Sequence, residues 1–208
     1  MVSGSKKKVL VAGATGYIGK AVVAELLDRD YIVFAIVRKE NQLEYSDQSN
    51  LNVISLEIGK NSDWTKQLPK IDIIISCLAS RSGCERDANF VDYSLNSDLL
   101  YFALKIKLQH FILLSAICIQ KPKLAFQRAK LRFNSELVAS GLRYSIVLPT
   151  AFFKSLSGQV NRIKNGKSFL VFGNGKRTSS LPISEIDLAK YIVTVSYTHL
   201  TLPTKRIV

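Results

Sequence analysis

A run of seven residues near the N-terminus, GATGYIG (13–19), constrains the fold of this chain more than any other stretch. It continues KKVLVAGA (7–14), a short apolar run that is typical of a strand buried on both faces. At such a strand-to-helix turn, Gly13 permits the tight turn, Gly16 lets the backbone approach a pyrophosphate, and Gly19 allows close helix–sheet packing. The phosphates then meet free amides and the positive end of the helix dipole. The loop residues expected to contact a dinucleotide are Gly13, Ala14, Thr15, Gly16, Tyr17, Ile18 and Gly19.

Strand and helix patterns alternate along the rest of the chain. Further runs that are typical of strands lie at 31–37, 51–58, 71–79, 110–117 and 143–149. Helical patterns separate them, including a long one at 88–108 and another at 124–140 that Gly141 ends. This alternation predicts an α/β fold with a Rossmann-type, doubly wound parallel sheet and helices on both faces.

The end of the chain differs in composition from the part before it. The helical pattern ISEIDLAKYIVTV runs into SYTHLTLPTKRIV, which is threonine-rich, contains a proline and does not continue the pattern. We expect residues 1–195 to form an NAD(P)-binding domain with the start of a substrate lobe. We expect residues 196–208 to be a non-native tail that resembles a translated sequencing adapter, with a short edge strand as the alternative.

The tip of the second strand predicts which nicotinamide cofactor binds. An NAD-binding domain carries an acidic residue there, which holds the ribose hydroxyls. This chain has Arg38 and Lys39 instead. A guanidinium can hold a 2′-phosphate in bidentate fashion, whereas a carboxylate would repel it. We therefore expect NADPH rather than NADH, with a solvated surface arginine as the alternative.

The formal net charge of +13 raises the question of a nucleic-acid partner. The 29 Lys and Arg residues are spread along the chain and only Lys6–Lys8 form a run. We therefore expect a solvated basic surface that favours anionic ligands and no nucleic-acid partner, with nucleic-acid binding as the alternative. No apolar run is long enough to cross a membrane, and neither a secretory signal nor a plastid transit peptide is evident. Cys77, Cys84 and Cys118 show no metal-ligand spacing; we expect no metal and reduced thiols in or near the core.

The stretch FQRAK (126–130) carries an unusual residue for a nicotinamide-dependent reductase. Short-chain reductases place a tyrosine four residues before a lysine, and its phenol supplies a proton. Here Phe126, which cannot donate one, precedes Lys130 by one helical turn, so both face the same way. Ser115 ends the fifth strand, where open α/β sheets bind ligands. Ser115 and Lys130 are the catalytic candidates, the serine orienting a ligand and the lysine holding the nicotinamide ribose.

Both candidates also have a structural alternative. Ser115 could be an ordinary strand-end hydroxyl, and Lys130 an ordinary surface lysine of a helix. We expect Lys130 to face the surface in either case, so that its loss leaves the fold intact.

Further cofactor contacts are expected after the fourth and sixth strands. These residues are Cys77, Leu78, Ala79, Pro149, Thr150 and Phe152. Phe152 and Phe153 are expected to line an apolar mouth near the nicotinamide, with core packing of Phe153 as the alternative.

Several longer stretches give the chain a specific resemblance. It resembles the atypical short-chain reductases of the NmrA-like group from residue 8 to about 195, in VLVAGATGYIGKAVV, IISCLASRSG, HFILLSAICIQKP, FQRAKLRFNSEL, YSIVLPTAFFKSLSGQV and FGNGK followed by PISEIDLA. Val147-Leu148-Pro149 departs from the group, which has an arginine before the proline, and the segment between the third and fourth strands is short. The C-terminal part of the group's substrate lobe, roughly a hundred residues, is absent.

The resemblance implies an NADPH-dependent reductase that converts a vinyl group of a magnesium-porphyrin pigment, a chlorophyll precursor, to an ethyl group. Hydride addition to a double bond conjugated with the macrocycle spreads negative charge over the ring, whereas ketone reduction creates an alkoxide that needs a positioned donor. Phe126 is compatible with the first reaction. Water, Tyr93 and Lys154 are the candidates for the final proton donor. Without the rest of the lobe, we expect NADPH binding, poor pigment reduction and an exposed apolar patch.

Two other functions stay open. The chain could be a non-enzymatic, NADP-binding regulatory protein of the NmrA-like type, which the missing tyrosine favours, or a reductase of another conjugated substrate. The expected compartment is the bacterial cytoplasm, or a plastid with the transit peptide missing from the sequence. Peripheral membrane association and oligomeric state stay open too.

Overall fold

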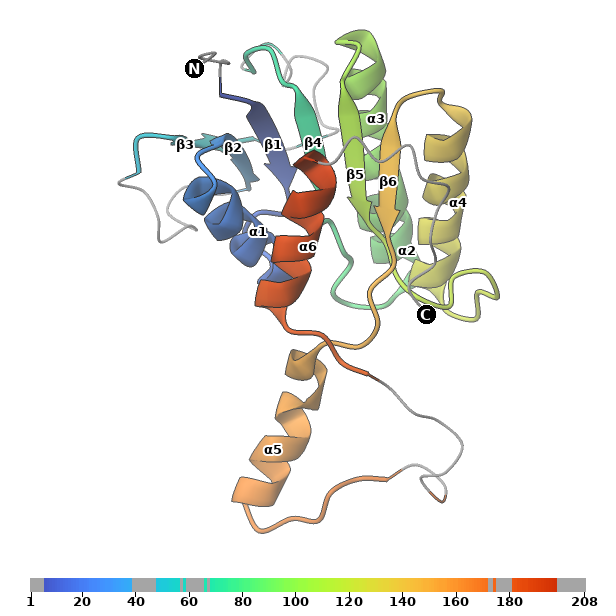
Figure 1. Ribbon diagram of the computed structural model, residues 1–208. Coiled ribbons are helices and arrows are strands. Elements are labelled where there is room, and N and C mark those ends of the chain that lie inside the picture. The colour runs from blue at the N-terminus through green and yellow to red at the C-terminus, as the bar shows by residue number, and fades with distance from the viewer. Residues whose placement is uncertain are drawn as a thin grey trace.

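Six strands form one parallel sheet in the computed structural model, which describes residues 6–38, 48–56, 58, 66, 68–171, 174 and 181–197 (Figure 1). The strands are β1 (Lys8–Ala12), β2 (Ile32–Val37), β3 (Leu51–Ser55), β4 (Ile73–Ser76), β5 (His110–Leu114) and β6 (Tyr144–Val147). Their order is β3-β2-β1-β4-β5-β6, and every neighbouring pair is parallel. The order reverses between β1 and β4, which confirms the doubly wound sheet and creates a crevice at their carboxyl ends.

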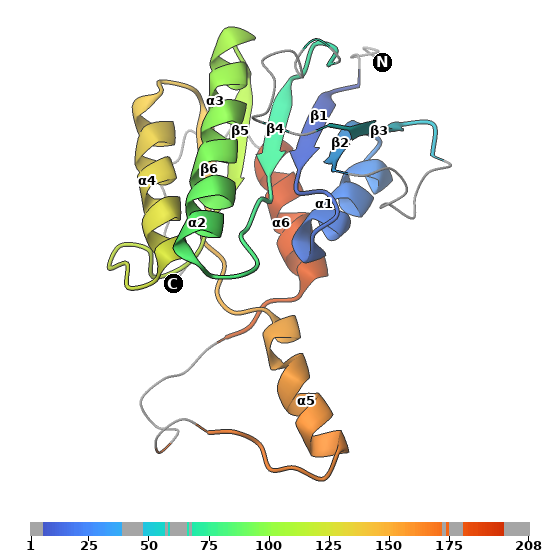
Figure 2. The ribbon, with the colours of Figure 1, turned by 180° about the vertical axis from the view of Figure 1, so that it is seen from behind.

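Helices cover both faces of the sheet (Figures 1 and 2). On one face, α1 (Tyr17–Asp28) and α6 (Glu185–Tyr197) pack on side chains such as Val9 and Val11. On the other face, α3 (Leu95–Lys105) and α4 (Ala125–Ala139) pack on the alternate side chains of the same strand, such as Leu10. Because each central strand is buried on both faces, its sequence is continuously apolar rather than alternating.

The predicted elements are present, but their bounds differ. The helix expected at 88–108 begins earlier, as α2 (Glu85–Ala88), and passes through a π-helical segment, η2 (Asn89–Ser94), before α3. The run at 110–117 forms a strand only to Leu114, although the Ser115 N–H still donates to the Val147 carbonyl at 2.9 Å. Gly141 follows α4 with φ +75°, the left-handed conformation that a helix C-cap region favours.

The chain leaves the sheet after β6 and forms η3 (Phe153–Leu156) and α5 (Ser157–Lys164), which stands away from the rest of the domain (Figures 1 and 2). Large apolar side chains of this region are exposed: Phe153, Val160, Ile163, Phe169, Leu170 and Val171. Phe153 is 54% exposed, so the alternative that it packs in the core is wrong. It is also not among the residues that line the cavity at the carboxyl edge of the sheet, unlike Phe152.

The final helix passes the boundary expected at residue 195. It continues to Tyr197, and the buried Ser196 hydroxyl donates to the Val193 carbonyl at 2.6 Å. Residues 198–208, which hold the rest of the expected tail, lie outside the described residues. Among the residues that the structure describes, no helix is long and apolar enough to cross a bilayer.

Candidate functional site

A cavity of about 1360 Å³ lies at the carboxyl edge of the sheet. The residues that directly follow β1, β2, β4 and β5, namely Gly13, Arg38, Cys77 and Ser115, all line it. The sequence-predicted residues that line the cavity are Gly13, Thr15, Gly16, Tyr17, Ile18, Arg38, Cys77, Leu78, Ala79, Ser115, Lys130, Pro149, Thr150 and Phe152. Ala14 and Gly19 are not among the lining residues, and Lys39 lies outside the described residues.

The turn between β1 and α1 needs glycine for geometric reasons. Gly13 has φ +77°, and a Cβ there would lie 2.7 Å from the Cys77 carbonyl oxygen. Gly16 is the N-cap of α1, where the described residues provide no side-chain cap for the first-turn amides. Free first-turn amides and the positive end of a helix dipole are chemically suited to an anion, and here they lie at the cavity wall.

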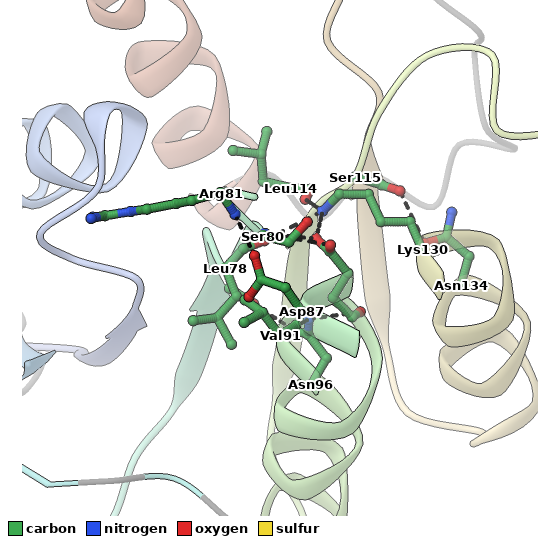
Figure 3. Close-up of polar contacts among 12 residues, drawn as sticks. Leu78, Ser80, Arg81, Asp87, Val91, Asn96, Leu114, Ser115, Lys130 and Asn134 are labelled. Carbon is green, nitrogen blue, oxygen red and sulfur yellow. Dashed lines mark hydrogen bonds and ion pairs between the residues drawn. The ribbon is translucent and has the colours of Figure 1, made fainter. Parts of the chain in front are cut away.

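Lys130 is buried rather than surface-facing, which corrects the sequence-based expectation. The residue is 7% exposed. Its Nζ lies 3.1 Å from Asp92 Oδ1. It also donates to the Leu78 and Leu114 carbonyls at 3.3 and 3.4 Å (Figure 3). The reason is tertiary: α4 packs on one face of the sheet and against η2, and Lys130, in its first half, reaches the backbone at the carboxyl ends of β4 and β5.

Asp92 is the functional candidate that sequence reasoning missed. It is 1% exposed, lines the cavity and lies in the π-helical segment η2. Its carboxylate oxygens both lie 3.4 Å from the Ser80 amide nitrogen. A signal was available: Asp92 and Asn96 occupy the apolar stripe that continues to Leu99, and polar residues on a core-facing stripe need buried partners.

Ser115, Phe126 and Lys130 line one cavity, as their spacing predicts. The Ser115 hydroxyl is buried and donates to Asn134 Oδ1 at 3.1 Å (Figure 3). It keeps its acceptor capacity for a ligand. Phe126 supplies an apolar wall at the position where related reductases have a phenol.

Tyr17 provides a phenol elsewhere in the cavity, and its environment keeps it protonated. Its hydroxyl donates to the Glu185 carboxylate, and that hydrogen bond, with smaller contributions from burial and the Glu185 charge, raises the pKa of Tyr17 to about 12. Phe152 meets the Tyr17 ring edge-on at 6.3 Å, and Lys154 Nζ lies 4.5 Å from the ring centroid. The phenol is therefore unsuited to act as a base near neutral pH.

The two protonatable side chains proposed as final donors occupy different places. Lys154 lines the cavity. Tyr93 is not among the lining residues, and its ring stacks under the Arg132 guanidinium at 3.7 Å. The geometry therefore favours Lys154 over Tyr93 as a group that can reach a bound ligand.

The cavity wall near Arg38 carries further charge. Arg38 is exposed, and Arg81 and Asp87 also line the cavity. The Asp87 carboxylate accepts the Arg81 and Ser82 backbone N–H groups at 3.0 and 2.9 Å. Hydrogen bonds from Ser82 hold the pKa of Asp87 below its usual value, and the Arg38 charge adds to this effect.

The cysteines differ from one another, and the expectation of core or near-core thiols is right only for Cys77. Burial raises the pKa of Cys77 to about 12, although the Lys130 charge opposes the rise. Cys84 and Cys118 are exposed, because both lie in loops at the carboxyl edge of the sheet. Among the described residues, no group of three potential metal ligands exists.

Comparison with known proteins gives a consistent result. A sequence model for a family described as NAD(P)H-binding matches residues 13–197. The chloroplastic divinyl chlorophyllide a 8-vinyl-reductase of Cucumis sativus is 44% identical over 207 residues, which cover 88% of this chain and 48% of the relative. The reductase of the same name from Oryza sativa subsp. indica is 45% identical over 205 residues, covering 90% and 50%. The chain therefore spans about half the length of these relatives.

Solved structures show the same fold. UDP-glucuronic acid 4-epimerase from Bacillus cereus, in complex with NAD, superposes with a TM-score of 0.79. The match covers 92% of this chain and 73% of the epimerase, at 20% identity. At that identity, the likeness concerns the fold alone.

Proposed function

This chain belongs to the NAD(P)H-binding family, and from that membership we propose that it serves the NADPH-dependent reduction of the 8-vinyl group of a divinyl chlorophyllide to ethyl. The observation that carries the proposal is the 44% identity with a reductase of that name over 88% of the chain. The pigment would be a flat magnesium porphyrin, which an apolar cavity wall suits. The relatives are about twice as long as this chain, so their complete reaction is proposed for this protein by analogy.

The site's own residues fit a nicotinamide dinucleotide. Gly13 and Gly19 hold β1 and α1 in close contact, where any Cβ would collide with backbone. The uncapped first turn of α1 would bind the pyrophosphate, and Ser115 and Lys130 would meet the nicotinamide ribose. The bound cofactor would supply the hydride; the chain's task is to bind and orient the reactants.

We assign the preference for NADPH to Arg38. The residue directly follows β2 and lines the cavity, where a dinucleotide's adenosine ribose lies in doubly wound folds. Its guanidinium would bind the 2′-phosphate. The residue that directly follows β2 is not acidic, so no carboxylate at that position favours the unphosphorylated ribose of NADH.

The missing tyrosine is compatible with vinyl reduction. Charge that develops on the substrate would delocalise over the conjugated macrocycle, so a phenol at position 126 is not required for the first step. Phe126 would instead contact the flat ring system. Lys154 and water are the proton sources that this cavity offers for the second step.

A second candidate function rests on the same residue. Phe126 also suits a protein that binds NADPH and a partner without turnover, because such a protein needs no acid. A reductase of another conjugated substrate is a third reading of the site. For the compartment, we propose a plastid if the source is eukaryotic, by analogy with the chloroplastic relatives, and the cytoplasm if it is bacterial.

One assay separates these functions. The chain, NADPH and divinyl chlorophyllide are mixed, and vinyl reduction is followed as a shift of the Soret band, with the Cucumis sativus reductase as positive control. NADPH binding is measured separately by cofactor fluorescence. Vinyl reduction by this chain, or by the chain extended with the C-terminal half of the Cucumis sativus reductase, supports the proposal. NADPH binding without vinyl reduction by either form favours the non-enzymatic function. Reduction only of another conjugated substrate, supplied in place of the pigment, favours the third.

A further inference from the structure

The ammonium of Lys130 has a full set of protein partners. An ammonium has three protons. In this structure they face Asp92 Oδ1 at 3.1 Å, the Leu78 carbonyl at 3.3 Å and the Leu114 carbonyl at 3.4 Å. The two carbonyls belong to residues at or just beyond the ends of β4 and β5, so Lys130 connects both strand ends to η2.

These three contacts are unequal. The carbonyl contacts are at the long end of the hydrogen-bond range and involve neutral acceptors. The contact with Asp92 is the shortest and joins opposite charges that are both removed from water, with side-chain exposures of 8% and 0%. A charge-assisted contact is stronger than a neutral one, and a buried charge cannot be left without a partner. A ligand hydroxyl can therefore replace a carbonyl, whereas Asp92 stays.

Asp92 is itself fixed from several sides. Its carboxylate faces the Ser80 amide, and its backbone carbonyl accepts from the Asn96 side chain at 3.1 Å. Asn96 Oδ1 in turn accepts the Ser76 hydroxyl at 2.6 Å, at the end of β4. This arrangement lies in a π-helical segment, a form that is frequent at functional sites because it redirects one side chain.

We propose that Asp92 is a positioning residue that holds the Lys130 ammonium at the crevice, ready to exchange one carbonyl for a nicotinamide-ribose hydroxyl. The proposal rests on the proposed cofactor binding. It explains why position 126 can lose its phenol without freeing the lysine: the orientation of Lys130 comes from η2 and from the ends of β4 and β5, and not from its own helix.

The test uses Asp92→Asn, which keeps the size of the side chain and removes its charge. We expect NADPH affinity to fall by about tenfold or more, because a charge-assisted contact is lost. In a Lys130→Met background, the same change is expected to alter affinity less than about twofold, since residues that act through one another are not additive. Asp98→Asn, on the neighbouring helix α3 and outside the cavity lining, is the control and should bind NADPH normally.

A measurement on the wild-type protein keeps the proposal testable even if the variants unfold. In lysine-labelled wild-type protein, the Lys130 ammonium should give an exchange-protected nitrogen NMR signal that NADPH shifts. An exposed, averaged Lys130 signal would overturn the proposal. So would an equal loss of affinity from Asp92→Asn in both backgrounds. Failure of the wild type to bind NADPH would instead reject the proposed function, and the ammonium signal would still report whether the pair is formed.

Discussion

Gly19 lies directly against the carbonyl of Gly13: a Cβ at Gly19 would sit 2.0 Å from that oxygen and 3.0 Å from the Ala14 Cα. Gly19 lies in the first turn of α1 and Gly13 directly follows β1, so their contact sets how closely the helix packs at the carboxyl edge. No side-chain rotation can relieve such a clash, because the atoms involved are backbone.

Gly19→Ala should therefore lower the free energy of unfolding by about 3 kcal/mol or more and abolish measurable NADPH binding. Urea denaturation and cofactor fluorescence check the two effects. Gly158→Ala is the matched control: it lies in α5 with open space around its Cβ position, and should change stability by no more than about 1 kcal/mol. Normal cofactor affinity in Gly19→Ala would show that the turn can rearrange.

Lys130→Ala should destabilise the fold, contrary to what its place in a helical pattern suggests. The substitution leaves the Asp92 carboxylate buried without its charge partner, which costs about 3–5 kcal/mol. Lys190→Ala, at an exposed position of α6, should change the free energy of unfolding by less than about 0.5 kcal/mol. Equal denaturation midpoints for the two variants would contradict the buried pair.

The sequence predicts those strands and helix faces that the spacing of neighbouring residues determines. The β4 run and its neighbours are continuously apolar because each strand is buried on both faces, and that pattern is visible without coordinates. The four-residue spacing of Phe126 and Lys130 likewise predicts a shared direction, because both lie on α4.

The errors concern contacts between distant segments. Lys130 pairs with Asp92 across 38 positions, through a π-helical segment that no local periodicity predicts. The exposure of Cys84 and Cys118 depends on how loops leave the sheet edge, and apolar neighbours in sequence do not determine that path. The exposure of Phe153 has a similar cause, because it depends on where η3 turns away from the sheet.

Arg38→Ala should weaken NADPH binding by about tenfold and leave NADH binding nearly unchanged, because only NADPH carries the 2′-phosphate. Dissociation constants for both cofactors, measured by fluorescence in low salt, give the comparison. Arg128→Ala removes an exposed arginine of α4 that is not among the cavity-lining residues, and should leave both constants unchanged. Equal binding of the two cofactors by the wild type would reject the assignment of Arg38.

His110 should make stability depend on pH. It is 5% exposed, and burial, helped by the charges of Arg143 and Lys7, lowers the pKa of His110 from 6.5 to about 4. As the pH falls below 6.5, the unfolded chain binds a proton that the folded chain does not, so stability is lost between pH 6.5 and 4, by up to about 3 kcal/mol.

Urea denaturation at pH 7.5 and pH 5.0 measures this loss. The His110→Gln variant keeps an amide that can hydrogen-bond the Ser145 hydroxyl, which His110 Nε2 contacts at 2.9 Å. Because carboxylates titrate alike in both proteins, the difference between their pH dependences isolates His110. A variant as pH-sensitive as the wild type would show that this histidine is not held neutral by the fold.

Phe126→Tyr tests why the phenol is absent. The substitution places a hydroxyl on α4 one turn from Lys130, in the cavity and at the position of the missing acid. If charge on the substrate delocalises over the macrocycle, an added acid does not lower the first barrier, and turnover of divinyl chlorophyllide should change by less than about tenfold in either direction. Pigment affinity should fall slightly, because a polar group now faces a flat apolar ligand.

Phe90→Tyr, at another aromatic position of the cavity wall, controls for the hydroxyl alone. Steady-state kinetics from the Soret shift, at saturating NADPH, give kcat and KM for each variant in a chain with demonstrated activity. A rise in kcat of several orders of magnitude in Phe126→Tyr, without one in Phe90→Tyr, would mean that the reaction does need an acid and that Phe126 marks a protein not selected for rapid turnover.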